Sequence, residues 1–265
     1  MTTPFVANIS NPPSKDLFVD KTILGDDTNH RNWIQFMNQV ASQINLPNYY
    51  GNPSECLNSD FNWQRGIATP VTQANGDGAY ISEKWQIHGA AVATYTITST
   101  QYAATADYQS ASKYYEHVVV SNYAGNGTLS DFYIYQQTTT GSNFLRLYQL
   151  QILNFSTLIV NNQTAAINMK FEILFHYDGS ADDLYESNTF DLTPGENYMA
   201  SDLITSSIAN KTVGAGAYVQ FRLVFCKLNA NTADIDVRYI KCEIANQPTA
   251  LYVDHALEKT RIDNS

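Results

Sequence analysis

The residues best suited to chemistry in this 265-residue chain are scattered, and their spacing matches no catalytic motif. Its five histidines show neither the His-x-His nor the His-Glu-x-x-His spacing that zinc sites use. No Gly-x-Ser-x-Gly elbow and no phosphate-binding glycine loop occurs. A glycosidase would need two carboxylates about 5–10 Å apart across a cleft, and no acidic pair stands out. The sequence therefore predicts a protein that is not an enzyme and has no cofactor and no catalytic metal.

One acidic segment offers the oxygen ligands that Ca²⁺ prefers, through Asp178, Asp182, Asp183 and Glu186. Their spacing differs from that of defined calcium loops, so the favoured interpretation is a solvated turn between two strands. Calcium binding at this loop is the alternative.

Tyrosine is abundant, with 18 copies in a chain of which only 15% is charged. Its ring and hydroxyl suit protein interfaces and sugar surfaces alike. Any single tyrosine is expected to lie in the core or on a sheet surface. For the set, an interface is an equal alternative, and the candidates to face a ligand are Tyr108, Tyr114 and Tyr123.

The net charge of −10 argues against nucleic acid as a partner, because lysine and arginine occur singly and form no cluster. A polar but weakly charged surface fits protein or sugar contacts better. No run approaches the ~20 apolar residues that span a bilayer, so we expect no membrane insertion. The first ten residues lack the basic start and apolar core of a secretory signal, which predicts folding in a cytoplasm.

Three cysteines are too few to form a disulfide framework. Buried free thiols are the favoured interpretation. The alternative is a pairing of Cys226 with Cys242 on neighbouring strands.

The elements that would position these residues begin with two segments that contain no β-pattern. Residues 1–25 include Pro12-Pro13, which enforces an extended backbone, and carry many apolar side chains for a free tail. We expect an attachment arm there, with a disordered leader as the alternative. Residues 26–46 predict an amphipathic helix, capped near Asp26 and Asp27. It packs either on its own domain or in a three-helix bundle, and the interface candidates of both segments are Phe5, Phe18, Trp33, Phe36, Met37, Val40 and Ile44.

From about residue 50 the apolar period becomes two. Residues 167–175 and 218–225 alternate, with the odd-numbered positions expected to face inward. Residues 235–244 change phase near Tyr239, which predicts a β-bulge, with Ile240, Cys242 and Ile244 inward after it. Eight or nine such runs, separated by turn residues, predict an all-β antiparallel jelly-roll sandwich over residues 50–251. Residues 202–210 suggest a short helical crossing, and residues 252–265 a strap or tail.

Three short segments carry a resemblance to a known family. Residues 57–66 read Leu-Asn-Ser-Asp-Phe-Asn-Trp-Gln-Arg-Gly, and residues 81–85 read Ile-Ser-Glu-Lys-Trp. This pair resembles the opening of a jelly-roll module of bacteriophage fibre and tail proteins, whose first strand has this pattern. Residues 239–251 resemble the last strand of the same module, although Pro-Thr-Ala-Leu replaces its usual Ala-Thr-Pro-Phe. The motif positions place Phe61, Trp63 and Trp85 in the core.

The resemblance implies a structural protein of a phage virion, assembled in the host cytoplasm. It further implies a homotrimer that docks on other virion proteins through its N-terminus and presents the jelly-roll to host-surface glycans. A purely structural head-decoration or tail-adaptor protein is the first alternative. A free carbohydrate-binding module is the second.

Overall fold

The computed structural model describes residues 54–64, 70–73, 76–89, 96–104, 114–121, 132–227, 232–245, 248, 251 and 262–263. All of them belong to the second of the two units into which the chain divides, Pro53–Ser265. The predicted arm and helix, with all seven of their interface candidates, lie outside these residues. The predicted strap at 252–265 falls outside them too, apart from residues 262–263. Within the described ranges, no helix is long and apolar enough to cross a membrane.

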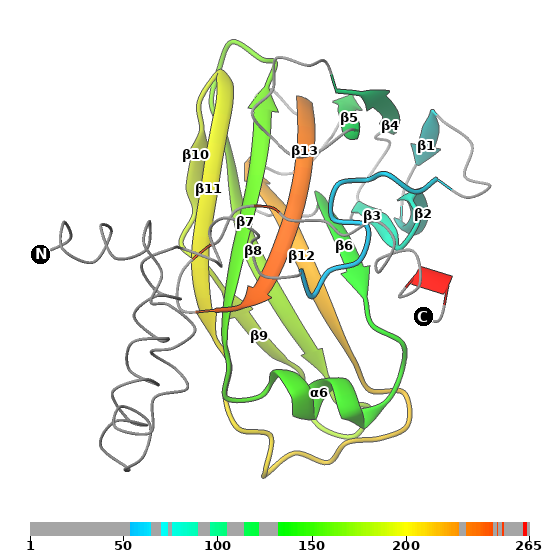
Figure 1. Ribbon diagram of the computed structural model, residues 1–265, viewed down its shortest axis with the longest axis vertical. Coiled ribbons are helices and arrows are strands. Elements are labelled where there is room, and N and C mark those ends of the chain that lie inside the picture. The colour runs from blue at the N-terminus through cyan, green and yellow to red at the C-terminus, as the bar shows by residue number, and fades with distance from the viewer. Residues whose placement is uncertain are drawn as a thin grey trace, which may run out of the picture. The chain divides into compact units, whose positions relative to one another are not determined.

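The described residues form two antiparallel sheets (Figure 1). The six-stranded sheet has the order β1 (Val71–Gln73), β4 (Thr96–Ala103), β5 (Tyr114–Ser121), β13 (Ala233–Ile244), β7 (Ile152–Asn161), β11 (Gly195–Ile204). The seven-stranded sheet has the order β10 (Phe190–Leu192), β8 (Ile167–His176), β12 (Tyr218–Lys227), β6 (Phe132–Gln137), β3 (Trp85–Gly89), β2 (Gly76–Ser82). Its last strand, β9 (Asp183–Glu186), pairs with β8 beyond the stretch that β10 covers. This arrangement confirms the predicted jelly-roll sandwich.

Alternating apolar residues on the two facing surfaces build the core. The inward positions of β8, from Ile167 to Phe175, are fully buried, and those of β12 from Val219 to Phe225 are almost so. Phe155 on β7 contacts both strands across the sandwich, because its ring lies 5.3 Å from that of Phe171 and 6.0 Å from that of Phe221. The strict period of two therefore predicted the core-facing side of these strands correctly.

The predicted bulge lies in β13, where the register to β7 shifts between Val237 and Tyr239. The extra residue moves Ile240 and Cys242 into the core, as the change of phase predicted. The prediction for Ile244 was wrong: it is 38% exposed, because it ends the strand.

Several local predictions were wrong. Residues 57–60 form turns and 61–64 have no regular structure, whereas the resemblance predicted a strand. Asn58 and Phe61 both have φ of 54°, a left-handed conformation that interrupts an extended chain. Trp63 is half-buried and not in the core, although Phe61 and Trp85 are fully buried there.

Two further differences concern segments of the sandwich. The helical crossing predicted for 202–210 is absent, since β11 continues to Ile204 and residues 205–210 contain no helix. Cys226 and Cys242 lie in β12 and β13, which belong to different sheets, so they are not on neighbouring strands. The sequence analysis also did not predict the helix α6 (Ser142–Tyr148).

Candidate functional site

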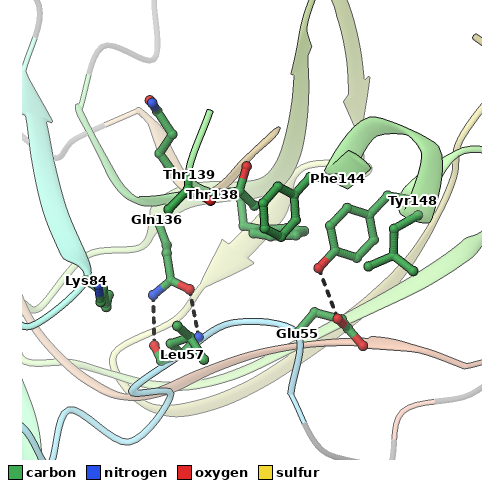
Figure 2. Close-up of a pocket in the computed structure, with 11 residues that line it drawn as sticks. Glu55, Leu57, Lys84, Gln136, Thr138, Thr139, Phe144 and Tyr148 are labelled. Atoms are coloured by element: carbon green, nitrogen blue, oxygen red, sulfur yellow. Dashed lines mark hydrogen bonds between the residues drawn. The ribbon is translucent and has the colours of Figure 1, made fainter. Parts of the chain in front are cut away.

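A pocket of about 340 Å³ opens beside α6, where the helix approaches the segment 55–57 (Figure 2). The lining side chains come from this segment, from the turn before β3, from β6 and the residues after it, from α6 and from β12. They are Glu55, Leu57, Lys84, Gln136, Gln137, Thr138, Thr139, Phe144, Leu147, Tyr148 and Phe221. The pocket therefore depends on the packing of the sandwich and not on one local motif.

The short helix α6 supplies the apolar wall. Gly141 has φ of 149° and donates its N–H to the carbonyl of Ala217 over 2.7 Å, which directs the chain into the helix. Leu145 and Tyr148 are buried on the inner side of α6, whereas Phe144 is half-buried and Leu147 is half-exposed. The helix thereby lines the pocket with Phe144 and Leu147, which are only partly covered by the core, and with Tyr148.

Tyr148 connects this wall to the opposite segment. Its hydroxyl donates a hydrogen bond to Oε2 of Glu55 over 3.0 Å (Figure 2), and its ring meets that of Phe221 edge-on at 5.4 Å. Burial, reinforced by the nearby Glu55 carboxylate, raises the pKa of the Tyr148 phenol well above its usual range. The phenol is therefore a permanent hydrogen-bond donor that holds the Glu55 carboxylate at the pocket.

The floor of the pocket is tied down by Gln136. Its side-chain amide accepts from the N–H of Leu57 over 2.7 Å and donates to the Leu57 carbonyl over 2.8 Å (Figure 2). Thr138 Oγ1 accepts the N–H of Val219 over 3.0 Å, and Gln137 Oε1 accepts from Gln220 over 2.8 Å. These bonds orient the polar lining before any ligand arrives.

The lining has two chemically different sides. Phe144, Leu147 and Phe221 offer apolar contact, while amide, hydroxyl, carboxylate and ammonium groups supply hydrogen bonds. Among the lining residues that the structure describes, Glu55 is the single carboxylate, and glycoside hydrolysis by the usual route needs two. The arrangement is suited to binding an amphipathic ligand.

The described part of the first motif, residues 57–64, meets the second motif, residues 81–85, next to this pocket. Asn58 accepts the N–H of Trp63 over 2.9 Å, and its amide donates to the carbonyls of Trp63 (3.0 Å) and Glu83 (2.9 Å). The Trp85 indole N–H donates to the carbonyl of Asn58 over 3.0 Å, and its ring lies 6.0 Å from that of Phe61. The two motifs thus form one structural unit, which contributes Leu57 and Lys84 to the lining of the pocket.

The acidic side chains of residues 178–186 form ion pairs and hydrogen bonds with neighbouring residues. Asp182 pairs with His176 over 2.9 Å, and Asp183 accepts from Lys211 over 2.5 Å. Asp178 accepts the N–H of Gly216 over 2.6 Å, and Glu186 pairs with Lys170. No group of three or more His, Cys, Asp or Glu side chains suited to a metal ion occurs in the described part of the chain. The pairing favours the interpretation as a solvated turn.

Of the tyrosines proposed to face a ligand, only Tyr114 lies in the described part of the chain, and it does not line the pocket. Tyr114 is half-buried at the start of β5, and Tyr108 and Tyr123 lie outside the described residues. Sequence reasoning missed α6, although the spacing of Phe144, Leu145 and Tyr148 at one- and four-residue steps contains a helical signal.

Comparisons with known proteins yield structural similarity alone. No family model matches the chain, and no curated protein matches it. The Clostridium thermocellum xylanase 10B CBM22-1–GH10 modules are similar at 11% identity and TM-score 0.39, over 69% of this chain and 30% of that one. The family 11 carbohydrate-binding module from Clostridium thermocellum gives 11% and 0.37, over 70% of this chain and all of that one.

A Stig cyclase, Fisc from Fischerella sp. TAU, is similar at 12% identity and TM-score 0.44, over 74% of this chain and 97% of that chain. Similarity at these TM-scores carries no argument about ligand or activity. None of the comparisons supports the predicted phage-fibre family, which stays a prediction from the two motifs.

Proposed function

We propose that this protein is a non-catalytic carbohydrate-binding jelly-roll module, and that the pocket beside α6 holds a sugar unit of a glycan. The observation that carries the proposal is the two-sided lining: Phe144 and Leu147 on one side, with oriented amide, hydroxyl and charged groups on the other. A sugar ring has the same division, since its C–H faces pack on apolar and aromatic surfaces while its hydroxyls need hydrogen-bond partners.

The size and preorganisation of the pocket support a small ligand. Its volume of about 340 Å³ lies at the lower end of the roughly 300–1,000 Å³ usual for small-molecule sites. The two hydrogen bonds between the Gln136 amide and the Leu57 backbone, and the hydrogen bond from Tyr148 to Glu55, orient polar groups before a ligand binds. Because folding already orders these groups, ligand binding loses little additional conformational entropy. We expect a terminal sugar or a short glycan end to be bound.

The experiment is a glycan array probed with the full chain, followed by isothermal titration with each oligosaccharide that gives a signal. Specific binding by a defined sugar end supports the proposal. We expect the affinity for a single sugar end to be low, because one small pocket buries little surface of the ligand. An array without any signal, repeated with the protein displayed on multivalent beads, would contradict it.

A virion role is the second candidate, and the joining of the two motifs in one structural unit favours it. Asn58 links residues 57–63 to Glu83 through side-chain hydrogen bonds, so the residues that carry the phage-fibre resemblance act together. On this proposal the chain is a homotrimer docked through residues 1–25. Three copies would then give a weak sugar site threefold avidity.

The virion proposal has its own tests. Sedimentation of the purified chain at the mass of a monomer would contradict the homotrimer. Removal of residues 1–24 is expected to abolish incorporation into particles and to leave the sandwich folded. Labelled electron microscopy of particles separates a host-facing fibre from a head-decoration or tail-adaptor protein. Incorporation that survives the truncation would show that the arm does not dock the protein.

A further inference from the structure

Two cysteines from opposite ends of the described chain meet inside the sandwich. Cys56 and Cys242 are both fully buried free thiols within the same core cluster. One hydroxyl oxygen, Ser54 Oγ, accepts the backbone N–H of both residues, which places them next to each other.

The backbones around the two thiols are already joined. The N–H of Glu55 donates to the carbonyl of Cys242 over 2.6 Å, and the N–H of Cys242 donates to Ser54 Oγ over 3.3 Å. Ser54 Oγ also accepts the N–H of Cys56 over 3.1 Å. These bonds hold the segment 54–56 against β13 without any covalent link, and they bring the two side chains to one place.

We propose that Cys56 and Cys242 are a modification site, at which a disulfide joins the segment 54–57 covalently to β13. The co-reactant is a small-molecule disulfide such as oxidised glutathione. One cysteine sulfur displaces a glutathione thiolate to form a mixed disulfide, and the second sulfur then displaces the other. Each protein thiol gives up one proton and together they give up two electrons, which leave with two molecules of reduced glutathione.

The bond would close a long loop and stiffen one wall of the pocket. Nearly the whole described chain lies between the two cysteines, and a cross-link over a long loop restricts the unfolded state most. Glu55 and Leu57, the neighbours of Cys56 in sequence, both line the pocket. Burial raises the pKa of the Cys242 thiol, so this thiol stays protonated and reacts slowly in the folded protein. The inference is independent of the ligand of the pocket.

The test incubates the full chain with oxidised glutathione, at low urea to open the segment, and then blocks remaining thiols by alkylation. Peptide mapping without reduction is expected to recover a cross-linked pair that contains Cys56 and Cys242. The melting temperature of the oxidised protein is expected to rise by roughly 5–15 °C and to return after reduction. Alkylation of both thiols after this treatment would overturn the proposal, and so would a cross-link that does not raise the melting temperature.

Matched variants separate this pair from the third cysteine. Cys226→Ser is expected to keep the cross-link and the melting shift, because β12 belongs to the other sheet. Cys242→Ala is expected to lose both. Where that variant does not fold, mapping of the Cys226→Ser protein alone decides, since it retains two thiols. A cross-link in the wild-type chain that disappears in Cys226→Ser would assign the disulfide to Cys226 and contradict the inference.

Discussion

The Ser99 hydroxyl lies 2.7 Å from Oε2 of Glu116, on the surface of the six-stranded sheet that faces the core. Gln64, from the first motif, donates to the other carboxyl oxygen over 2.8 Å. Glu116 is fully buried, and burial raises its pKa to about 8, although the bonds from Ser99 and Gln64 act in the opposite direction. A carboxyl group of this kind is neutral at physiological pH and links stability to pH.

The raised pKa predicts that the contribution of Glu116 to stability decreases as pH increases from about 4.5 to about 8. In this window the unfolded state releases the proton while the folded state retains it, so each pH unit costs about 1.4 kcal/mol. Glu116→Gln is expected to remove this slope and to keep both hydrogen bonds. Urea unfolding at four pH values measures it, with the exposed Glu196→Gln as control. A wild-type slope in Glu116→Gln would assign the dependence elsewhere.

Among the polar residues of the two motifs, Asn58 is the one whose substitution is expected to lower the free energy of unfolding most. Asn58→Ala removes bonds to the N–H and carbonyl of Trp63 and to the carbonyl of Glu83, and it leaves these groups in a largely buried place. Its φ of 54° also disfavours alanine. We expect a loss of about 2–4 kcal/mol in the free energy of unfolding. Asn210→Ala, at an exposed turn, is the control and should change stability by less than about 0.5 kcal/mol.

The strands were predictable because burial imposes a period of two, which β8 and β12 follow with few exceptions, such as the buried Val224. The change of phase in β13 predicted a bulge near Tyr239, and the register shifts between Val237 and Tyr239. The strand predicted for residues 57–64 was wrong for a physical reason. Alternating apolar and polar residues also occur in irregular segments, and here the Asn58 side chain forms hydrogen bonds with backbone groups that a neighbouring strand would otherwise bind. A local pattern cannot distinguish these two solutions.

The pocket was not predictable from the sequence, because none of its segments carries a signal alone. Tyr148 lies 93 residues after Glu55 and Gln136 lies 79 residues after Leu57, yet they meet only when α6 closes over the segment 54–57. The tyrosine count indicated a binding surface, but the count could not choose which rings face a ligand.

Phe144 is the side chain whose removal is expected to weaken glycan binding most specifically. It lines the pocket and is only half-buried, so Phe144→Ala removes ring contact without opening the core. Loss of one aromatic contact of about 0.5–1.5 kcal/mol corresponds to roughly 2- to 12-fold weaker binding. Isothermal titration with the best array ligand measures this change. Leu184→Ala, which removes an exposed side chain outside the pocket, is the control, and equal affinities in the two variants would place the ligand elsewhere.

Gly214 is expected to tolerate no side chain, because two loops touch there through their backbones. A Cβ at this position would lie 2.2 Å from the carbonyl oxygen of Asp178, and the N–H of Gly214 already donates to the carbonyl of Tyr177 over 2.8 Å. Gly214→Ala must push the loops apart and should cost about 1–3 kcal/mol, or roughly 3–10 °C in melting temperature. The exposed Ala215→Ser in the same turn is the matched control for differential scanning calorimetry. Equal melting temperatures for the two variants would mean that the loops separate freely in solution, and the acidic segment at Asp178 would then lack the anchoring that keeps its carboxylates paired.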